Sequence, residues 1–169
     1  MDSITVLKNY LAAVFRGDID DSNETLTKFS HDASLFEVRP KIVLFPKDTE
    51  DVKAVVRFVY ENKKQYPDLS VTVRAAGTCM AGGPINDSII LDITRYMHGI
   101  KSLTKEQSVL LPGTFYRDFE PEATKLGVML PCYTASKNIN TIGGMVGNNS
   151  AGEKTLYYGK MENYINELR

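Results

Sequence analysis

The sequence lacks several features that whole classes of protein require. Its apolar runs, such as those at residues 88–93 and 109–111, are far shorter than the roughly 20 residues of a membrane-spanning helix. Its 20 Lys and Arg residues are balanced by 21 Asp and Glu residues without any block of like charges, which argues against a nucleic-acid partner. The N-terminus has no basic stretch followed by a small-residue cleavage site. We therefore expect a cytoplasmic protein without a transmembrane segment, and peripheral association of a longer enzyme with a membrane stays open.

Cysteine and histidine are also scarce. Cys79 and Cys132 have no CxxC spacing and no nearby histidine cluster, so the sequence suggests neither a zinc site nor a disulfide, and both residues fit small side chains that pack. His31 and His98 are the only histidines, and neither lies in a pattern typical of base catalysis or metal binding. We expect surface or capping histidines and no bound metal. No catalytic residue is predicted from the sequence.

The sequence does contain enough apolar material for a folded core, because 43% of its residues are hydrophobic. The spacing of apolar residues predicts an amphipathic helix over residues 1–17, and polar composition predicts a connector over residues 18–28. A buried strand is predicted at residues 41–46. A helix is predicted at residues 48–63, beginning with Asp48 as N-cap.

Two further strands are predicted at residues 70–74 and 88–94, and the apolar character of the second suits burial on both faces. Three strands of this kind, the first two joined by a helix, predict a small right-handed parallel sheet. The later sequence predicts a hairpin, a helix, a short strand and a final helical run, at residues 99–111, 114–126, 128–130 and 161–168. Pro121 is expected to kink or restart the helix that contains it. No closing strand follows, so we expect a domain that is cut at its C-terminal end.

Glycines are concentrated in two short segments. Seven of the twelve glycines lie in RAAGTCMAGG (residues 74–83) and TIGGMVGNNSAG (residues 141–152). The first segment directly follows a predicted strand. Small residues at such a place let successive backbone N–H groups converge on an anion, which makes a phosphate site without requiring an excess of positive charge.

Spacing tests the competing phosphate-binding motifs. Gly77 and Gly82 match the two glycines of a P-loop, but Gly83 and Pro84 stand where that loop needs Lys and Ser or Thr. The G-x-G-x-x-G pattern of a Rossmann fold is absent. For the first segment alone, a structural glycine-rich turn is the main alternative. The second segment adds polar side chains beside its glycines, at residues 148–150, and therefore favours an extended ligand.

Four stretches together resemble one known family: VLFPKDTEDVKAVVRFV, VRAAGTCMAGGPINDSIILDITRYM, LPGTFYRDFE and LPCYTASKNINTIGGMVGNNSAGEKTLYYGK. They are similar to the flavoproteins of the vanillyl-alcohol oxidase or p-cresol methylhydroxylase (PCMH) type, in the branch of D-lactate dehydrogenase and the glycolate oxidase flavin subunit. The resemblance implies an α+β fold, the PCMH-type FAD-binding domain. In that fold a small parallel βαβ subdomain is followed by a mixed or antiparallel α+β subdomain, which is here truncated at the C-terminus. We expect an N-terminal helical extension at residues 1–35 and this domain at residues 36–169.

The resemblance also implies which residues bind FAD. The first segment would wrap the pyrophosphate and continue toward the flavin, through Arg74, Ala75, Ala76, Gly77, Thr78, Cys79, Met80, Ala81 and Gly82. The second would hold the ribityl, pyrophosphate and adenosine parts, through Pro131, Thr134, Ser136, Ile142, Gly143, Gly144, Asn148, Asn149 and Gly152. Relatives that tether their flavin to a histidine carry it where Thr78 stands, and Cys132 is too far before Gly143 to match a tethering cysteine. The resemblance therefore implies noncovalent FAD.

The function expected from the resemblance is that of an FAD-dependent oxidoreductase. It would be a D-2-hydroxyacid dehydrogenase, acting on a D-lactate- or glycolate-like substrate and passing hydride from that substrate to the flavin. The small-molecule substrate would bind through domains that this chain does not contain, and the chain alone is expected to be inactive and to self-associate. The alternatives are a nucleotide-binding module without redox chemistry and a structural α/β domain with glycine-rich turns.

Overall fold

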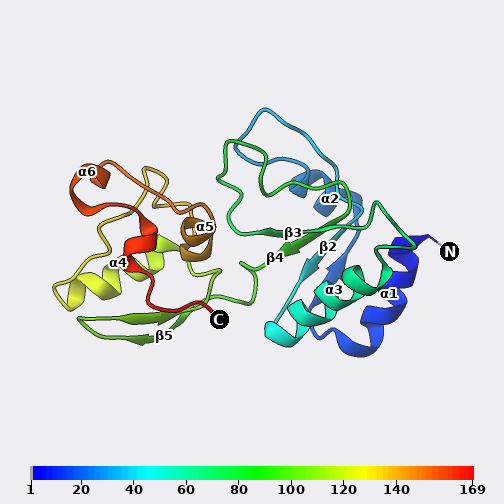
Figure 1. The fold of residues 1–169 in the computed structure, drawn as a ribbon, viewed down its shortest axis with the longest axis horizontal. Helices are drawn as coiled ribbons and strands as arrows, with labels where there is room; N and C mark the ends of the chain where they lie inside the picture. The colour runs from blue at the N-terminus through cyan, green and yellow to red at the C-terminus, as the bar shows by residue number, and fades with distance from the viewer. Residues whose placement is uncertain (1) are drawn as a thin grey trace. The chain divides into compact units, whose positions relative to one another are not determined.

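The computed structural model describes residues 2–169, which form two compact units that meet in the sequence between Met97 and His98. The first unit contains three helices and a sheet, and the second contains a hairpin and shorter helices (Figure 1). Within residues 2–169, no helix has both the length and the apolar character needed to cross a membrane. The two units are described separately below.

The sheet of the first unit has the strand order β1-β2-β4-β3, built from Asp18–Asp20, Ile42–Phe45, Ile89–Asp92 and Val71–Arg74. β2 and β3 both pair with β4 in parallel register, with Val43 opposite Ile90 and Thr72 opposite the same residue. The predicted parallel sheet is therefore confirmed. β4 is its central strand, and all four residues of that strand are buried.

Residues 18–28 are not the connector that their polar composition predicted. Asp18–Asp20 forms β1, which pairs antiparallel with β2, and Asn23–Phe29 forms helix α2 with Ser22 as its N-cap. The prediction was wrong because this three-residue edge strand contains only one apolar residue, Ile19. One residue cannot show the alternation of apolar and polar side chains by which a strand is recognised in a sequence. The region expected as a helical extension thus also contributes a strand to the sheet.

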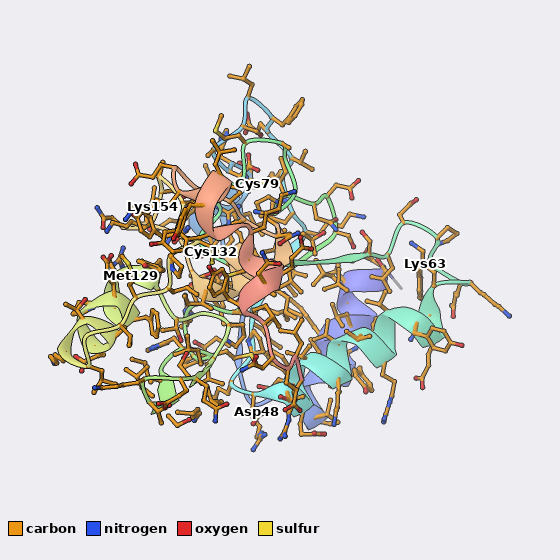
Figure 2. The ribbon with its side chains drawn as sticks, turned by 60° about the vertical axis from the view of Figure 1, so that its left-hand side comes forward. Asp48, Lys63, Cys79, Met129, Cys132 and Lys154 are labelled. Carbon is orange, nitrogen blue, oxygen red and sulfur yellow. The ribbon has the colours of Figure 1, made fainter. Side chains whose placement is uncertain are left out.

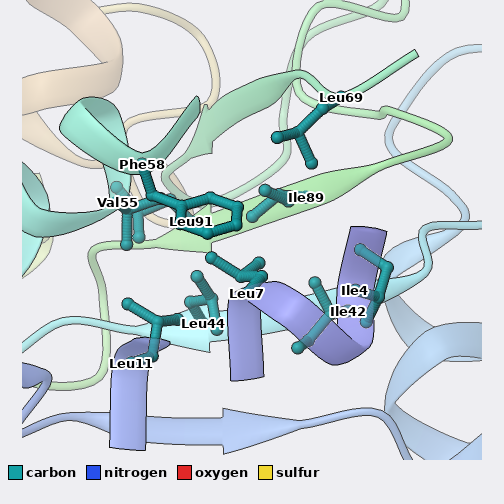
Figure 3. Close-up of a cluster of buried hydrophobic side chains, with 10 residues drawn as sticks. All are labelled: Ile4, Leu7, Leu11, Ile42, Leu44, Val55, Phe58, Leu69, Ile89 and Leu91. Atoms are coloured by element: carbon teal, nitrogen blue, oxygen red, sulfur yellow. The ribbon is translucent and has the colours of Figure 1, made fainter. Parts of the chain in front are cut away.

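Each face of the sheet is covered by helices. Helices α1 (Ser3–Val14) and α3 (Thr49–Asn62) lie over one face, and α3 runs between Asp48 and Lys63 in Figure 2. Figure 3 shows the core that they enclose, formed by Ile4, Leu7, Leu11, Ile42, Leu44, Val55, Phe58, Leu69, Ile89 and Leu91. The alternate residues of β2 and β4 point to the other face, where they pack with Phe29 of α2 in a cluster of Phe29, Val43, Phe45 and Ile90. Burial on both faces explains why all of β2 and the first three residues of β4 are apolar.

The second unit begins with the predicted hairpin, formed by β5 (Ile100–Leu103) and β6 (Ser108–Leu110). Helix α4 (Tyr116–Lys125) follows and continues through Pro121 without a restart. The unit is completed by helices α5 (Ile142–Gly147) and α6 (Thr155–Tyr158) and by the 3-10 helix η1 (Met161–Tyr164). Its core gathers around Tyr116, Phe119, Ala123, Cys132, Ile142, Met145 and Met161.

Two predicted elements of the second unit do not form. Residues 128–130 are not a strand, because no partner strand is beside them and the carbonyl of Leu130 accepts a hydrogen bond from the Tyr116 hydroxyl at 3.0 Å. The helical run predicted at residues 161–168 is limited to the single turn of η1. Met161 is the buried residue of that turn, and the following residues are mostly exposed.

The first prediction concerns Asp51, a fully buried carboxylate that accepts hydrogen bonds from the backbone N–H groups of Arg16 and Lys47, both at 2.8 Å. Asp51→Ala leaves both donors without an acceptor, and we expect the free energy of unfolding to fall by about 2 to 4 kcal/mol. Asp51→Asn keeps one accepting oxygen and should cost less. The exposed neighbour Glu50 provides the control, because Glu50→Ala should change stability by no more than about 0.5 kcal/mol. Urea unfolding measures all three, and equal stability of Asp51→Ala and Glu50→Ala would contradict the prediction.

Candidate functional site

The two glycine-rich segments lie in different units. The first loop, defined here as residues 75–83, leaves the carboxyl end of β3 and leads back to the start of β4 (Figure 1). The second loop, residues 131–152, lies in the second unit and includes helix α5. The sequence prediction for the site therefore draws on two separate pieces of structure, each with its own geometry.

Gly77 adopts the conformation that its surroundings require. Its φ is +70°, in the left-handed region that disfavours side chains. A Cβ at this position would lie 2.5 Å from Nη2 of Arg74, so the guanidinium occupies the space of the missing side chain. Both the backbone conformation and the neighbouring guanidinium therefore require glycine at this position.

Arg74 is the last residue of β3, where it stands opposite Asp92 of β4. Its guanidinium lies 5.1 Å from the centre of the Phe29 ring, and its Nη1 is buried without a hydrogen-bond partner among residues 2–169. Burial lowers the pKa of Arg74, and the charges of Asp92 and Asp32 oppose that shift. A half-buried cation therefore lies directly against the first loop.

The rest of the first loop is built from small residues in an open conformation. Ala75 to Cys79 are half-buried, whereas Met80 and Ala81 are exposed. The Cys79 thiol accepts a hydrogen bond from the backbone N–H of Ala81 at 3.5 Å, which gives the cysteine a role in shaping the turn. Gly82 lies against Phe36, since a Cβ there would be 3.0 Å from the phenylalanine ring.

In the second loop, a buried amide organises two of the predicted hydroxyls. The Nδ2 group of Asn140 donates to the Oγ1 atom of Thr134 at 2.5 Å and to the Oγ atom of Ser136 at 3.4 Å, and the two hydroxyl oxygens are 2.9 Å apart. Asn140 is only 4% exposed, and its Oδ1 has no partner among the described residues. Pro131, another of the predicted residues, is also buried and shortly precedes Thr134 in the sequence.

Asn140 was missed by the sequence interpretation. It lies outside the glycine cluster, and its importance depends on the contact with residues 134 and 136 rather than on any pattern around it. One local signal was available: an asparagine directly before Thr141, whose Oγ1 caps α5 by accepting from the N–H of Gly144 at 3.1 Å.

The start of α5 already uses its backbone donors within the unit. The N–H of Ile142 binds the carbonyl of Thr114, and the N–H of Gly143 binds the carbonyl of Pro112, both at 2.8 Å. Together with the capped N–H of Gly144, three of the predicted cofactor-binding residues are paired internally through their N–H groups. Any contact that they make with a cofactor must use other atoms.

The remaining predicted residues of the second loop divide into two kinds. Gly152 serves close packing, because a Cβ there would lie 1.7 Å from the carbonyl oxygen of Tyr133. Asn149 has a φ of +44°, and its Oδ1 accepts from the N–H of Glu162 at 3.0 Å, which ties the loop to η1. Asn148, by contrast, is exposed at the end of α5. The structure thus gives Asn149 an internal partner and presents Asn148 to solvent.

Cys132 has the packing role that the sequence suggested. It is 1% exposed, its Sγ lies 3.4 Å from Sδ of Met161, and burial raises the pKa of its thiol. His31 and His98 are both exposed, and His31 lies 3.5 Å from a carboxylate oxygen of Glu37. In the part of the chain that the structure describes, no three His, Cys, Asp or Glu side chains are grouped as a metal site would require.

Residues 40–169 match the family model described as an FAD binding domain. Among curated proteins, the chain is 31% identical to a D-2-hydroxyglutarate dehydrogenase of Haemophilus influenzae, covering 92% of this chain and 15% of that protein. It is 30% identical to a D-lactate dehydrogenase of Anaerostipes hadrus, covering 88% of this chain and 30% of that protein. It is 26% identical to the glycolate oxidase subunit GlcD of Bacillus subtilis, with 88% and 31% covered.

Solved structures share the fold. The chain superposes on an alkyldihydroxyacetonephosphate synthase with a TM-score of 0.78 and 19% identity, covering 94% of this chain and 32% of that one. For the 6-hydroxy-D-nicotine oxidase of Arthrobacter nicotinovorans, the TM-score is 0.68 and the identity 23%, with 86% and 31% covered. This chain therefore spans between about one seventh and one third of the length of these relatives.

The second prediction separates packing glycines from open ones. Gly152→Ala forces a Cβ into the Tyr133 carbonyl, and we expect it to lower the free energy of unfolding of the cofactor-free protein by about 2 to 3 kcal/mol. Gly147 is the matched control, since no described atom lies within 4 Å of a Cβ built on it in the same loop. Gly147→Ala should be neutral or stabilising by about 0.5 kcal/mol. Thermal melts of the two variants provide the comparison, and a Gly152→Ala protein as stable as the parent would refute the packing role.

Proposed function

The chain belongs to the FAD binding domain family, of the PCMH type, and we propose that it supplies the phosphate-binding part of the FAD site in a D-2-hydroxyacid dehydrogenase. The observation that carries the proposal is the first loop: a run of small residues with Gly77 in the left-handed conformation, directly after a parallel strand and against the half-buried Arg74 guanidinium. This arrangement suits a ligand with a pyrophosphate group.

The first loop fits such a group in size and in its backbone conformation. Its small residues leave the backbone accessible, and the Arg74 guanidinium lies against Gly77, where it supports the loop. We therefore assign the pyrophosphate to residues 74–79, with residues 80–82 continuing toward the flavin. The exposure of Met80 and Ala81 is compatible with that continuation.

The second loop is assigned the ribityl and adenosine parts and further pyrophosphate contacts, as the resemblance implies. The hydroxyls of Thr134 and Ser136 are held by Asn140, so they are oriented before any ligand binds. Asn148 offers an exposed amide at the end of α5. We add Asn140 to the predicted residues as the side chain that positions the two hydroxyls.

Bound FAD would supply the redox chemistry, as the acceptor of the hydride that leaves the substrate carbon. The tasks of this chain are to bind the phosphates, to orient the cofactor and to leave the flavin available to the substrate-binding part of the enzyme. Attachment is proposed to be noncovalent, because Thr78 occupies the position of the tethering histidine and Cys132 is buried in the core. The proposed substrate class, a D-2-hydroxy acid, is supported by the names of the curated relatives.

The absorption spectrum of the purified intact protein tests this function. We expect flavin bands, flavin release into the supernatant on acid precipitation, and bleaching of the bands by D-2-hydroxyglutarate, D-lactate or glycolate under anaerobic conditions. L-lactate is the control and should bleach the flavin far more slowly than D-lactate. A protein that binds FAD but is reduced by none of these acids would instead be a nucleotide-binding module. A protein that binds no FAD would overturn the proposal.

The third prediction addresses the first loop through two glycines of similar backbone conformation. Gly77 and Gly127 have φ values of +70° and +73°, so valine is comparably strained at both positions. Gly77→Val should abolish FAD binding, because its side chain also displaces the Arg74 guanidinium. Gly127→Val should retain FAD, since no described atom lies within 4 Å of a Cβ at that position. Flavin-to-protein ratios measure the difference, and unchanged flavin content in Gly77→Val would remove the first loop from the site.

The fourth prediction distinguishes the two asparagines of the second loop. Asn148→Ala should weaken FAD retention more than it lowers the melting temperature of the cofactor-free form. Asn149→Ala should lower both, because it loses the bond to the Glu162 N–H and places alanine at a φ of +44°. Titration with FAD and thermal melts of the two variants give the comparison. Equal losses in both measurements for Asn148→Ala would make it a structural turn residue.

A further inference from the structure

Residues 30–38, called the brace here, precede the region that matches the FAD binding domain, yet they contact the first loop at two points. The backbone N–H of Ala33 donates to the carbonyl of Gly77 at 3.1 Å. The ring of Phe36 lies where it would be 3.0 Å from a Cβ on Gly82. The brace thus holds the loop near both of its left-handed glycines.

We propose that the brace is a working part of the cofactor site. Through the Ala33–Gly77 hydrogen bond and the Phe36–Gly82 contact it holds the first loop in the conformation that receives the pyrophosphate, with Asp32 of the brace and Arg74 against Gly77 as further positioning residues. This inference rests on the function proposed above, because it takes the first loop to be the pyrophosphate site. It extends that function by assigning a positioning role to a segment outside the matched domain.

The brace holds its own shape. The N–H of Val38 bonds to the carbonyl of Ser30 at 2.9 Å, and His31 and Glu37 face one another as an isolated antiparallel bridge. Inside this closure, Oδ1 of Asp32 accepts from the N–H of Ser34 at 2.8 Å and from its hydroxyl. The N–H of Phe36 donates to that hydroxyl at 3.1 Å. A segment that is closed on itself can act on the loop as a fixed support.

The bond from Ala33 sets the direction of a donor in the loop. A trans peptide is planar, so its N–H and C=O groups point in opposite directions. The structure contains no cis peptide bond among residues 2–169. Because the Gly77 carbonyl points to the brace, the N–H of Thr78 in the same peptide points away from it. The brace therefore orients this N–H group for a ligand on the other side of the loop.

Asp32 and Arg74 are half-buried, and each has one buried polar atom without a partner. These atoms, Oδ2 of Asp32 and Nη1 of Arg74, form no hydrogen bond within residues 2–169. The charges of Asp92, opposite Arg74 on β4, and of Asp32 raise the pKa of Arg74 against the effect of burial. Two carboxylates thus already offset the guanidinium. We assign Arg74 to holding the loop, through its contact with Gly77, rather than to neutralising a phosphate directly.

The test is a double-mutant cycle in the intact protein, with FAD affinity and the unfolding free energy of the cofactor-free form measured for each variant. Asp32→Asn preserves the shape of the side chain and the Oδ1 acceptor but removes the charge. Arg74→Gln removes the cation. We expect each to weaken FAD binding by about tenfold or more, and the double variant to lose much less than the product of the two. Glu61→Gln is the matched control, an exposed carboxylate of α3 outside the brace that should leave FAD affinity unchanged.

A second variant tests the backbone contact. Ala33→Pro removes the N–H that binds the Gly77 carbonyl, and we expect weaker FAD binding together with less protection of the Thr78 amide from hydrogen exchange when FAD is added. If Gly77→Val loses FAD while Asp32→Asn, Arg74→Gln and Ala33→Pro all bind it like the parent, the inference is wrong and the proposed function stands. The inference would also be overturned if the losses of FAD affinity were fully explained by losses of unfolding free energy in the cofactor-free form. If Gly77→Val itself retains FAD, the assignment of the first loop fails instead.

Discussion

β4 is paired on both edges and buried on both faces, and the first unit is arranged around this constraint. Parallel pairing with β2 and β3 aligns the carboxyl ends of these strands, which brings Arg74 opposite Asp92. Apolar residues alternate between two clusters, one under α1 and α3 and the other under α2. The first loop can remain irregular and open because the strands that carry its two ends are held rigidly.

The same arrangement explains why an arginine can be half-buried beside the loop. Phe29 of α2 covers one side of the guanidinium, and carboxylates on the brace and on β4 stabilise its charge. The shape of the first loop thus depends on contacts with α2 and the brace, which lie some forty residues earlier in the chain. It also depends on Arg74 at the end of β3. In this unit, the contacts that define a candidate binding loop come largely from outside the loop.

Glycine serves different purposes in the two loops. Gly77 has a left-handed backbone and leaves room for a neighbouring side chain, which suits an open loop. Gly143 and Gly152 instead allow two backbone segments of the second unit to approach one another, at Pro112 and at Tyr133. A cluster of glycines in a sequence therefore does not by itself distinguish a ligand cradle from dense backbone packing. The partner of each absent Cβ makes that distinction.

The sequence by itself determined the parallel strands, α3 with its Asp48 cap, the hairpin, the position of both glycine-rich loops and the family. These features are encoded in contiguous residues, as apolar periodicity, a capping residue or a motif. Tertiary structure alone decided that residues 18–28 form β1 and α2, that Asn140 orients Thr134 and Ser136, and that Ala33 binds Gly77. Each of these features depends on a contact between two segments, and neither segment's local sequence predicts the other. A short edge strand, a single amide and one backbone N–H acquire their roles only from the partner that folding places beside them.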